Sequence, residues 1–302
     1  MTSIIIAAHN EAAVIGQCLD SLLAGVPRGD FDVTVVANGC TDATAGVAAA
    51  RPGVRVLDLP EAGKAAALNA GDEAAAGFPR VYLDADIVIS AAGIRALVEA
   101  LGRPTADPAT TALAVVPRRE LDVARSPLLV RAYFAINSRL PAFQNTLFGR
   151  GVIALSAEGR ARFGRFPDAI ADDLFLDSLF IATEKREVGS VSARIAAPER
   201  TRDLVRRLVR VRRGNASMRA ALAADPDAPG KARPAARTSW LRDVALRHPS
   251  LAPAAACYAA ISLTAAVLAR LPGQPGQAWG RDDSSRHGDR PARQPEAADG
   301  RG

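Results

Sequence analysis

The stretch Ser3-Ile4-Ile5-Ile6-Ala7-Ala8-His9-Asn10-Glu11, near the amino terminus, decides the fold. Residues 3–8 carry no charge and include three isoleucines, a pattern typical of a strand buried on both faces of a parallel sheet. The polar triplet 9–11 ends this strand, and Asn10 can cap a helix that runs to about residue 23. A buried strand followed at once by a helix predicts the first unit of an α/β fold.

The same unit recurs three times further along the chain. Strands are expected over residues 32–37, 54–59 and 80–83, and helices over 41–50, 64–76 and 90–101. This alternation with short connections predicts an α/β domain with a doubly wound, mostly parallel sheet. Beyond residue 110 the rhythm loosens, with strands expected over 111–116, 152–156 and 187–191 and helices over 128–140, 172–183 and 201–224.

Composition limits the classes of function. The net charge is +6, but residues 199–247 alone hold thirteen Arg and Lys against five Asp and Glu, so the rest of the chain is slightly acidic. One local basic segment suits phosphate groups or anionic lipid, and we expect no nucleic-acid partner. The three cysteines form no CxxC pair, and no secretory signal precedes the first strand. A catalytic part in the reducing cytoplasm is the expectation.

The carboxyl-terminal third differs in character from the rest. We expect a catalytic domain over 1–220, a basic Pro/Ala linker over 221–250, an apolar helix over 251–271 as a helical appendage, and a disordered tail over 272–302. The apolar helix is uncharged from residue 251 to 269, close to the lower limit for crossing a bilayer. It fits a membrane-associated or re-entrant helix, a true span, or a buried core helix, and the first is preferred.

The sequence Asp84-Ala85-Asp86 follows the fourth expected strand. In such sheets ligands bind beyond the carboxyl ends of the strands. Where the strand ends, the two carboxylates can converge on one hard cation, Mn²⁺ or Mg²⁺, that bridges the phosphates of a sugar nucleotide. Alone, an Asp-x-Asp sequence also fits a solvated turn.

Four elements together resemble the family 2 glycosyltransferases, which have the GT-A fold. Residues 3–11 are similar to the family's opening P-x-x-N-E element, and residues 35–42 (Val-Val-Ala-Asn-Gly-Cys-Thr-Asp) are similar to its V-V-D-D-G-S-T-D segment. Residues 63–69 (Gly-Lys-Ala-Ala-Ala-Leu-Asn) resemble G-K-A-x-A-L-N, and residues 83–86 resemble its D-A-D. The resemblance covers about residues 1–220, with the elements in the family's order.

The resemblance implies roles for particular residues. Asp86 would be the principal metal ligand, with Asp84 facing the ribose or the metal, and Lys64 would help to seat the nucleotide. The donor-binding set would comprise Ala8, Glu11, Asn38, Asp42, Lys64, Asn69, Asp84, Arg210 and Arg213. Ala37 and Asn38 stand where the family has acidic residues, which leaves the nucleobase open, and Asn38-Gly39 also fits a plain turn.

The second half of the chain is expected to supply a base, since an inverting transfer needs a carboxylate that takes the acceptor's proton. Asp172-Asp173, before Leu174-Phe175-Leu176, resembles the family's E-D pair, which implies Asp173 as the base and Asp172 as its neighbour. Acidic residues at a helix start also need no catalytic explanation. Gly149 and Gly151 resemble the glycine-bearing segment on the acceptor side.

Arg210 and Arg213 lie in the position of the family's Q-x-x-R-W element, where arginines would bind the donor diphosphate. The Gln and Trp are absent, which argues against a processive polysaccharide synthase, and a solvated or lipid-facing helix is the alternative. No GxGxxG follows the first strand, and Ala65 follows Lys64 where a P-loop needs Ser or Thr, so dinucleotide-binding and P-loop sites are excluded.

The sequence therefore predicts an inverting, metal-dependent glycosyltransferase that uses a nucleotide-sugar donor and a glycan or lipid-linked acceptor, with a cell-envelope role. We expect it at the cytoplasmic side of a membrane, held by the helix 251–271. A catalytically degenerate glycosyltransferase-like protein, acting as a membrane-associated scaffold, is the alternative.

Overall fold

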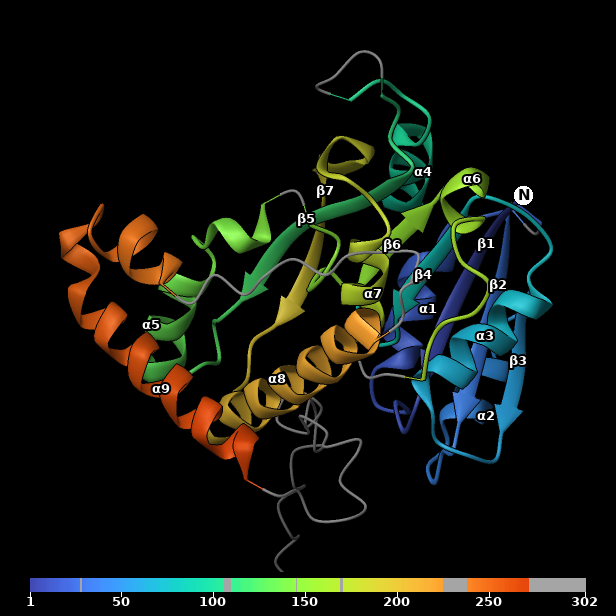
Figure 1. Cartoon of the computed structure of the whole chain (residues 1–302). Helices are drawn as coiled ribbons and strands as arrows, with labels where there is room; N and C mark the ends of the chain where they lie inside the picture. The colour runs from blue at the N-terminus through green and yellow to red at the C-terminus, as the bar shows by residue number, and fades with distance from the viewer. Residues whose placement is uncertain (28, 106–109, 145, 169–170, 225–237, 272–302) are drawn as a thin grey trace, which may run out of the picture.

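A seven-stranded sheet forms the centre of the molecule (Figure 1). The computed structural model describes residues 1–27, 29–105, 110–144, 146–168, 171–224 and 238–271. The strand order is β3-β2-β1-β4-β6-β5-β7. The strands are β1 (Thr2–Ala8), β2 (Phe31–Asn38), β3 (Val54–Leu59), β4 (Arg80–Asp84), β5 (Ala114–Asp122), β6 (Val152–Leu155) and β7 (Lys185–Ala196).

Most strand pairs are parallel. β1 pairs in parallel with β2 and β4, β2 with β3, and β5 with β7, whereas β6 runs antiparallel to both β4 and β5. The predicted doubly wound, mostly parallel sheet is confirmed. The antiparallel β6 joins the two parallel parts and brings the second half of the chain next to the end of β4.

Helices cover both faces of the sheet, as the alternation in β1 requires. Ile4 and Ile6 face a core shared with α1 (Ile15–Leu23), α2 (Thr44–Ala49) and α4 (Ala91–Ala100). Ile5 faces a second core shared with α3 (Lys64–Ala74) and α7 (Asp172–Ser178). Because successive side chains of a strand point to opposite faces, both sides of the central strand become buried. The short α6 (Ala157–Arg160) follows β6.

β5 and β7 are longer than the sequence predicts. The expected strands ended where the apolar runs end, but β5 and β7 stay paired from Arg118 opposite Ser192 to Asp122 opposite Ala196, past an irregularity after Pro117. Their outer halves carry polar side chains, and the backbone hydrogen bonds of the ladder stabilise them nonetheless.

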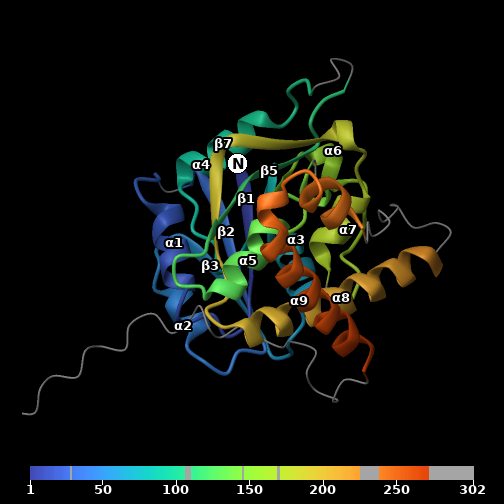
Figure 2. The same cartoon turned by 90° about the vertical axis from the view of Figure 1, so that its left-hand side faces the viewer.

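A helical group lies beyond the ends of β5 and β7 (Figures 1 and 2). It consists of α5 (Leu128–Asn137), α8 (Thr201–Ala224), α9 (Ala252–Arg270), the π-helical turn η3 (Trp240–Ala245) and the 3₁₀ turns η1 (Pro141–Phe143) and η4 (Pro249–Leu251). These elements pack on one another around two small apolar cores, so the predicted carboxyl-terminal helical appendage is present. A further 3₁₀ turn, η2 (Ala182–Glu184), immediately precedes β7 and lies outside this group.

The predicted linker and tail fall partly outside the described residues, namely 225–237 and 272–302. Within the predicted linker, η3 is helical and buries Val244 against α5 and α9. One helix in the described part of the chain, Pro249–Arg270, is long and apolar enough to cross a membrane. Only 17% of its most apolar stretch is buried inside the protein.

Candidate active site

The loops after β1 and β2 are joined by hydrogen bonds that need a left-handed turn. Asn10 has φ +54°, a conformation that asparagine tolerates. Its side-chain Oδ1 accepts from the backbone N–H of Thr41 at 2.6 Å and of Asp42 at 3.2 Å. His9 Nδ1 lies 2.6 Å from the carbonyl oxygen of Asn38. These bonds fix the loop that carries Glu11, a residue that lines a large cavity.

Four residues of the predicted donor-binding set do not line this cavity, and three of them bind backbone groups through their side chains. The amide of Asn38 is fully buried, donates to Ala8 O at 2.8 Å and accepts from Gly63 N at 3.0 Å. Asn69 bonds in the same way to the N–H and C=O of Phe166. Asp42 accepts from Thr44 N and Ala12 N at the start of α2. Ala8, Asn38, Asp42 and Asn69 therefore shape the loops around the cavity.

Lys64 connects the two halves of the site. It is the first residue of α3, and its Nζ lies 2.9 Å from Asp84 Oδ1 and 3.0 Å from Asp172 Oδ2. Burial of the ammonium lowers the pKa of Lys64, but the carboxylates of Asp172 and Asp84 outweigh burial and raise the pKa above its ordinary value. The lysine is therefore a permanent cation between the end of β4 and the start of α7.

Asp84, the last residue of β4, is held by the residue that precedes β6. The backbone N–H of Asp84 donates to Gly151 O at 2.8 Å, and Gly151 has φ +70°. A Cβ at Gly151 would lie 2.5 Å from Ile87 Cγ1 and 3.4 Å from Asp84 Oδ2, so only glycine lets β6 approach so closely. Asp86 is exposed and lines the cavity.

The donor set at this end of β4 suits an ion that substrate phosphates help to hold. The described residues contain no group of three or more metal-ligating side chains. Magnesium-type sites commonly use one or two carboxylates and take further oxygen ligands from phosphates and water. Asp84 and Asp86 both line the cavity and would offer such a pair of hard oxygen ligands.

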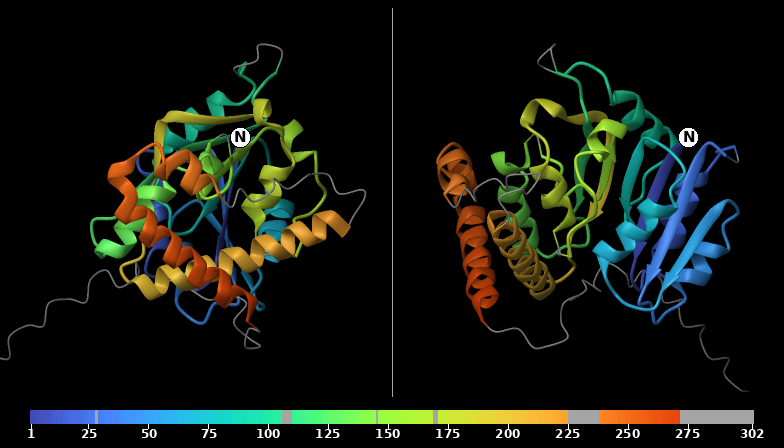
Figure 3. Two further views of the ribbon diagram at one scale, coloured as in Figure 1. Left: turned by 60° about the vertical axis from the view of Figure 1, so that its left-hand side comes forward. Right: turned by 45° about the vertical axis from the view of Figure 1, so that its right-hand side comes forward.

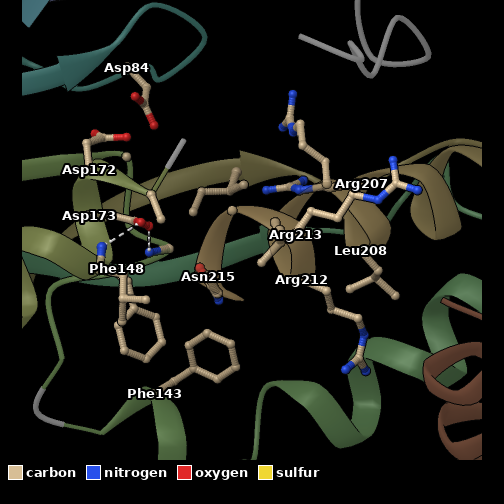
Figure 4. Close-up of a pocket in the computed structure, with 18 of the residues that line it drawn as sticks. Asp84, Phe143, Phe148, Asp172, Asp173, Arg207, Leu208, Arg212, Arg213 and Asn215 are labelled. Carbon is tan, nitrogen blue, oxygen red and sulfur yellow. Dashed lines mark hydrogen bonds between the residues drawn. The ribbon is translucent and has the colours of Figure 1, made fainter. Parts of the chain in front are cut away.

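Asp173 is held in a fixed orientation at the start of α7 (Figure 4). Its Oδ2 accepts from Gly149 N at 2.9 Å, and its Oδ1 accepts from Leu174 N at 2.8 Å. Burial and the neighbouring Asp172 raise the pKa of Asp173 to about 6. Burial also raises the pKa of Asp172, against the opposing effect of Lys64. A carboxylate with this pKa is ionised at neutral pH and is still basic enough to take a proton.

The cavity has a volume of about 1740 Å³ and lies between the sheet and the helical group. One wall carries the carboxylates and Lys64, and the facing wall is the arginine-rich side of α8 (Figure 4). Its remaining lining includes apolar side chains from the helical group and the β6 side: Leu140, Phe143, Phe148, Tyr258 and Leu263. The structure thus brings Glu11, Lys64, Asp84, Asp86, Gly149, Gly151, Asp172, Asp173, Arg210 and Arg213 to one cavity.

Arg213 has structural partners that the sequence does not predict. Its guanidinium donates to the carbonyl oxygens of Leu268 at 3.2 Å, Ala269 at 3.2 Å and Leu271 at 2.8 Å. These carbonyls end α9, where the helix dipole favours a cation. In this structure Arg213 therefore holds α8 to α9.

Several cavity residues were missed in the sequence. Arg207 and Arg212 belong to the arginine row of α8, which was noted only for Arg210 and Arg213. Arg119 lies on β5 with its guanidinium carbon 4.6 Å above the ring of Phe143. Burial, and then the positive charges of Arg207 and Arg150, lower the pKa of Arg119 to about 10. The row had a visible signal, whereas Arg119 becomes a candidate only once β5 lies beside α8.

Comparisons with known proteins bear on the family and the fold. A sequence model of the family described as Glycosyl transferase family 2 matches residues 3–154. A search of curated proteins finds no match to this chain. Among solved structures, the chain is similar to the mannosyltransferase PcManGT from Pyrobaculum calidifontis, solved with GDP-Man and Mn²⁺. The identity is 24% and the TM-score 0.57, covering 89% of this chain and 78% of that one.

Two further solved structures are more distant. TarS residues 1–349 from S. aureus, in complex with UDP-GlcNAc, has 17% identity and a TM-score of 0.49, covering 66% of this chain and 59% of that one. Glucosyl-3-phosphoglycerate synthase from Mycobacterium tuberculosis, with Mn²⁺, UDP and glucosyl-3-phosphoglycerate, has 23% identity and a TM-score of 0.44, covering 65% and 70%. At 24% identity the likeness to PcManGT concerns the fold, which is GT-A.

Proposed function

The chain belongs to glycosyl transferase family 2, and we propose that it transfers a sugar from a nucleoside-diphosphate sugar to an acceptor hydroxyl with inversion at the anomeric carbon. One observation carries the proposal: a fixed, basic carboxylate at Asp173 opens into the same cavity as Asp84, Asp86 and Lys64. The donor's charged groups and the acceptor's proton thus each have a matching partner in one site.

The donor binds, in this proposal, at the carboxyl ends of β1 and β4. Lys64 and the arginines of α8 are the cations that the diphosphate would meet, and Glu11 lies at the rim where the nucleoside would lie. Asn38 supports the loop beneath the nucleoside without contacting it. The similar solved structures contain GDP-Man, UDP-GlcNAc or UDP. The nucleobase of the donor that this chain uses is to be identified with the panel of sugar nucleotides described below.

Asp86, with Asp84, would hold Mn²⁺ or Mg²⁺ together with diphosphate oxygens. Bound there, the ion would supply positive charge for the leaving diphosphate. The ammonium group of Lys64 lies 2.9 Å from Asp84 and 3.0 Å from Asp172, so its charge limits the repulsion between these two carboxylates.

The acceptor hydroxyl loses its proton to Asp173. As the hydroxyl oxygen forms its bond to the anomeric carbon, the bond to the diphosphate oxygen breaks on the opposite face, and the nucleoside diphosphate leaves with the electron pair. Gly149 N holds the carboxylate in place for this transfer. Gly149 and Gly151 line the same cavity and would leave room for a sugar to approach the backbone.

A lipid-linked acceptor would fit the side of the cavity that the helical group forms. Such an acceptor agrees with a cell-envelope role at the cytoplasmic side of a membrane. Phe143, Phe148 and Leu140 line this side of the cavity with apolar surface, and Arg119 and Arg207 add positive charge. An apolar chain and an anionic head group would both find complementary surface there. The helix that closes this side, α9, is the one with membrane-like composition.

The test is nucleoside-diphosphate release from a panel of sugar nucleotides, with and without Mn²⁺ or Mg²⁺, in the presence of detergent-solubilised lipid acceptors. Metal-dependent release that is lost in Asp86→Ala and Asp173→Asn, but kept in the exposed-acid control Asp58→Asn, supports the proposal. Binding of a sugar nucleotide without turnover of any donor would instead favour the degenerate scaffold.

A further inference from the structure

The outer side of the helical group carries exposed apolar side chains. In Figure 3, η3 and α9 follow one another along the edge of the molecule farthest from β3. The apolar side chains exposed there include Leu128 (80% exposed) and Leu129 (54%) of α5, Leu246 (68%) after η3, and Val267 (49%) and Leu271 (53%) on or after α9. We call this set the α5–α9 face.

The two parts of this face are in contact. Cys257 of α9 donates its thiol to the carbonyl oxygen of Leu129 at 3.5 Å, which places the start of α5 beside the middle of α9. The inner stripe of α9, formed by Ala255, Ile261 and Ala265, is buried. A helix on the surface of a soluble protein normally turns polar side chains outward, whereas α9 is apolar on both its buried and its exposed side.

We propose that the α5–α9 face docks on an anionic lipid bilayer, with α9 lying in the plane of the interface and not crossing it. This inference rests on the proposed membrane association and adds its surface, its orientation and its lipid charge.

Charge complementarity identifies the occupant as an anionic bilayer. The charged residues of the described segment 238–271 are Arg242, Asp243, Arg247 and Arg270, with His248 beside them, so cations outnumber the single acid. Arg242, Arg247 and Arg270 are all exposed. Cations around an apolar surface are typical of a helix that rests among anionic head groups.

The contacts of α9 argue against a span. Arg213 binds three carbonyl oxygens at its carboxyl end, and Tyr258 stacks on Tyr133 of α5 with ring centroids 4.9 Å apart. Trp240 of η3 lies 5.9 Å from Tyr258. A crossing helix would lose all of these contacts and expose the apolar side chains of α5 beneath it. Lying flat keeps these contacts and buries only the outer stripe.

This orientation joins the bilayer to the active site. Tyr258, Leu263 and Ala266 of α9 also line the cavity that holds Asp173. A lipid-borne acceptor could therefore enter from the bilayer beside α9 without leaving the apolar phase.

The experiment is co-sedimentation of the full chain with vesicles of phosphatidylcholine alone or mixed with phosphatidylglycerol. Val267→Glu and Leu128→Glu change exposed residues on α9 and α5, and the matched control is Ile181→Glu, which is 65% exposed beside η2. We expect wild type and control to bind the anionic vesicles, each test variant to bind about 10-fold more weakly, and alkaline carbonate to release the bound protein.

The outcomes separate this inference from the proposed function. The docking surface would be overturned by equal vesicle binding of all variants or by bound protein that resists carbonate. Test variants that alter only the oligomeric state of the protein, and not its vesicle binding, would also overturn it. Wild type that binds neither vesicle would overturn membrane association itself. Release of nucleoside diphosphate from a soluble donor, measured without vesicles, tests the transferase reaction independently of both.

Discussion

The proposed reaction depends on the carboxylate of Asp173 as its general base. We expect Asp173→Asn to lower kcat by about 10²- to 10⁴-fold, because an amide cannot take the acceptor proton. The amide oxygen can still accept a hydrogen bond, so donor affinity and the far-ultraviolet circular dichroism spectrum are expected to stay unchanged. Stopped turnover with unchanged donor binding, measured by calorimetry, is the expected result. A variant that turns over at the wild-type rate would remove Asp173 from the mechanism.

The pKa of Asp173 sets the acidic limit of the reaction. The ionised form is the active base, and burial and Asp172 raise its pKa to about 6. Activity is therefore expected to be full above pH 7 and to fall as the pH drops through about 6, instead of near the ordinary value of about 4. A profile of kcat/KM against pH measures this limb, and a plateau extending down to pH 5 would contradict it.

The pH at which activity falls is expected to depend on the charge of Lys64. Its charge lowers the pKa of both Asp172 and Asp173, so removing it in Lys64→Met raises both values and shifts the acidic limb to higher pH. Donor affinity is expected to fall as well, since the diphosphate loses a cation. The pH profile and donor titration of Lys64→Met, set beside Lys64→Arg, separate the two effects. Lys64→Arg keeps the charge and should leave the limb near 6.

At the scale of the elements, the close approach of β6 to β4 depends on Gly151. Because its φ is +70° and a Cβ would lie 2.5 Å from Ile87, Gly151→Ala is expected to lower the free energy of unfolding by about 1–3 kcal/mol. Urea denaturation measures the change. Gly164→Ala is the matched control, since nothing lies within 4 Å of its Cβ position. Equal stability of both variants would show that β6 can move away at no cost.

The first four strands and the polar residues at their ends were predictable from local sequence. Isoleucine and valine runs specify β1 and β2, and the residues that break each run, such as Glu11 and Asp84, lie by geometry at the carboxyl ends. Strand order was less accessible: nothing in Val152–Leu155 states that it runs antiparallel between β4 and β5. That placement results from the chain's path after α5, which hydrophobic periodicity does not encode.

At the scale of the whole molecule, the sequence identified which residues share the site more reliably than what each one contacts. Motif order brought Lys64, Asp86 and Asp173 together, and the cavity holds all three. Motif order did not reveal that the side-chain amides of Asn38 and Asn69 bind backbone groups. Such bonds depend on segments that are distant in the sequence, as Phe166 is from Asn69. Residue type alone cannot separate a buried structural amide from one that reads a ligand.

Arg213 is the residue through which this difference can be measured. Its three bonds to the carboxyl end of α9 predict that Arg213→Ala loosens α9, lowers the free energy of unfolding by about 1–3 kcal/mol and speeds amide hydrogen exchange in α9. If the guanidinium also binds the donor diphosphate, donor affinity falls in the same variant. Arg206→Ala is the control, since that side chain is 71% exposed and pairs with Asp203 at 3.5 Å. Faster exchange with unchanged donor affinity would assign Arg213 to the helical group alone. The other arginines of α8 that line the cavity, Arg207, Arg210, Arg212 and Arg219, would then be left to bind the diphosphate. Faster exchange together with weaker donor binding would mean that the guanidinium serves both α9 and the donor, and would couple α9 to the active site. Unchanged exchange would contradict the role of Arg213 in holding α9.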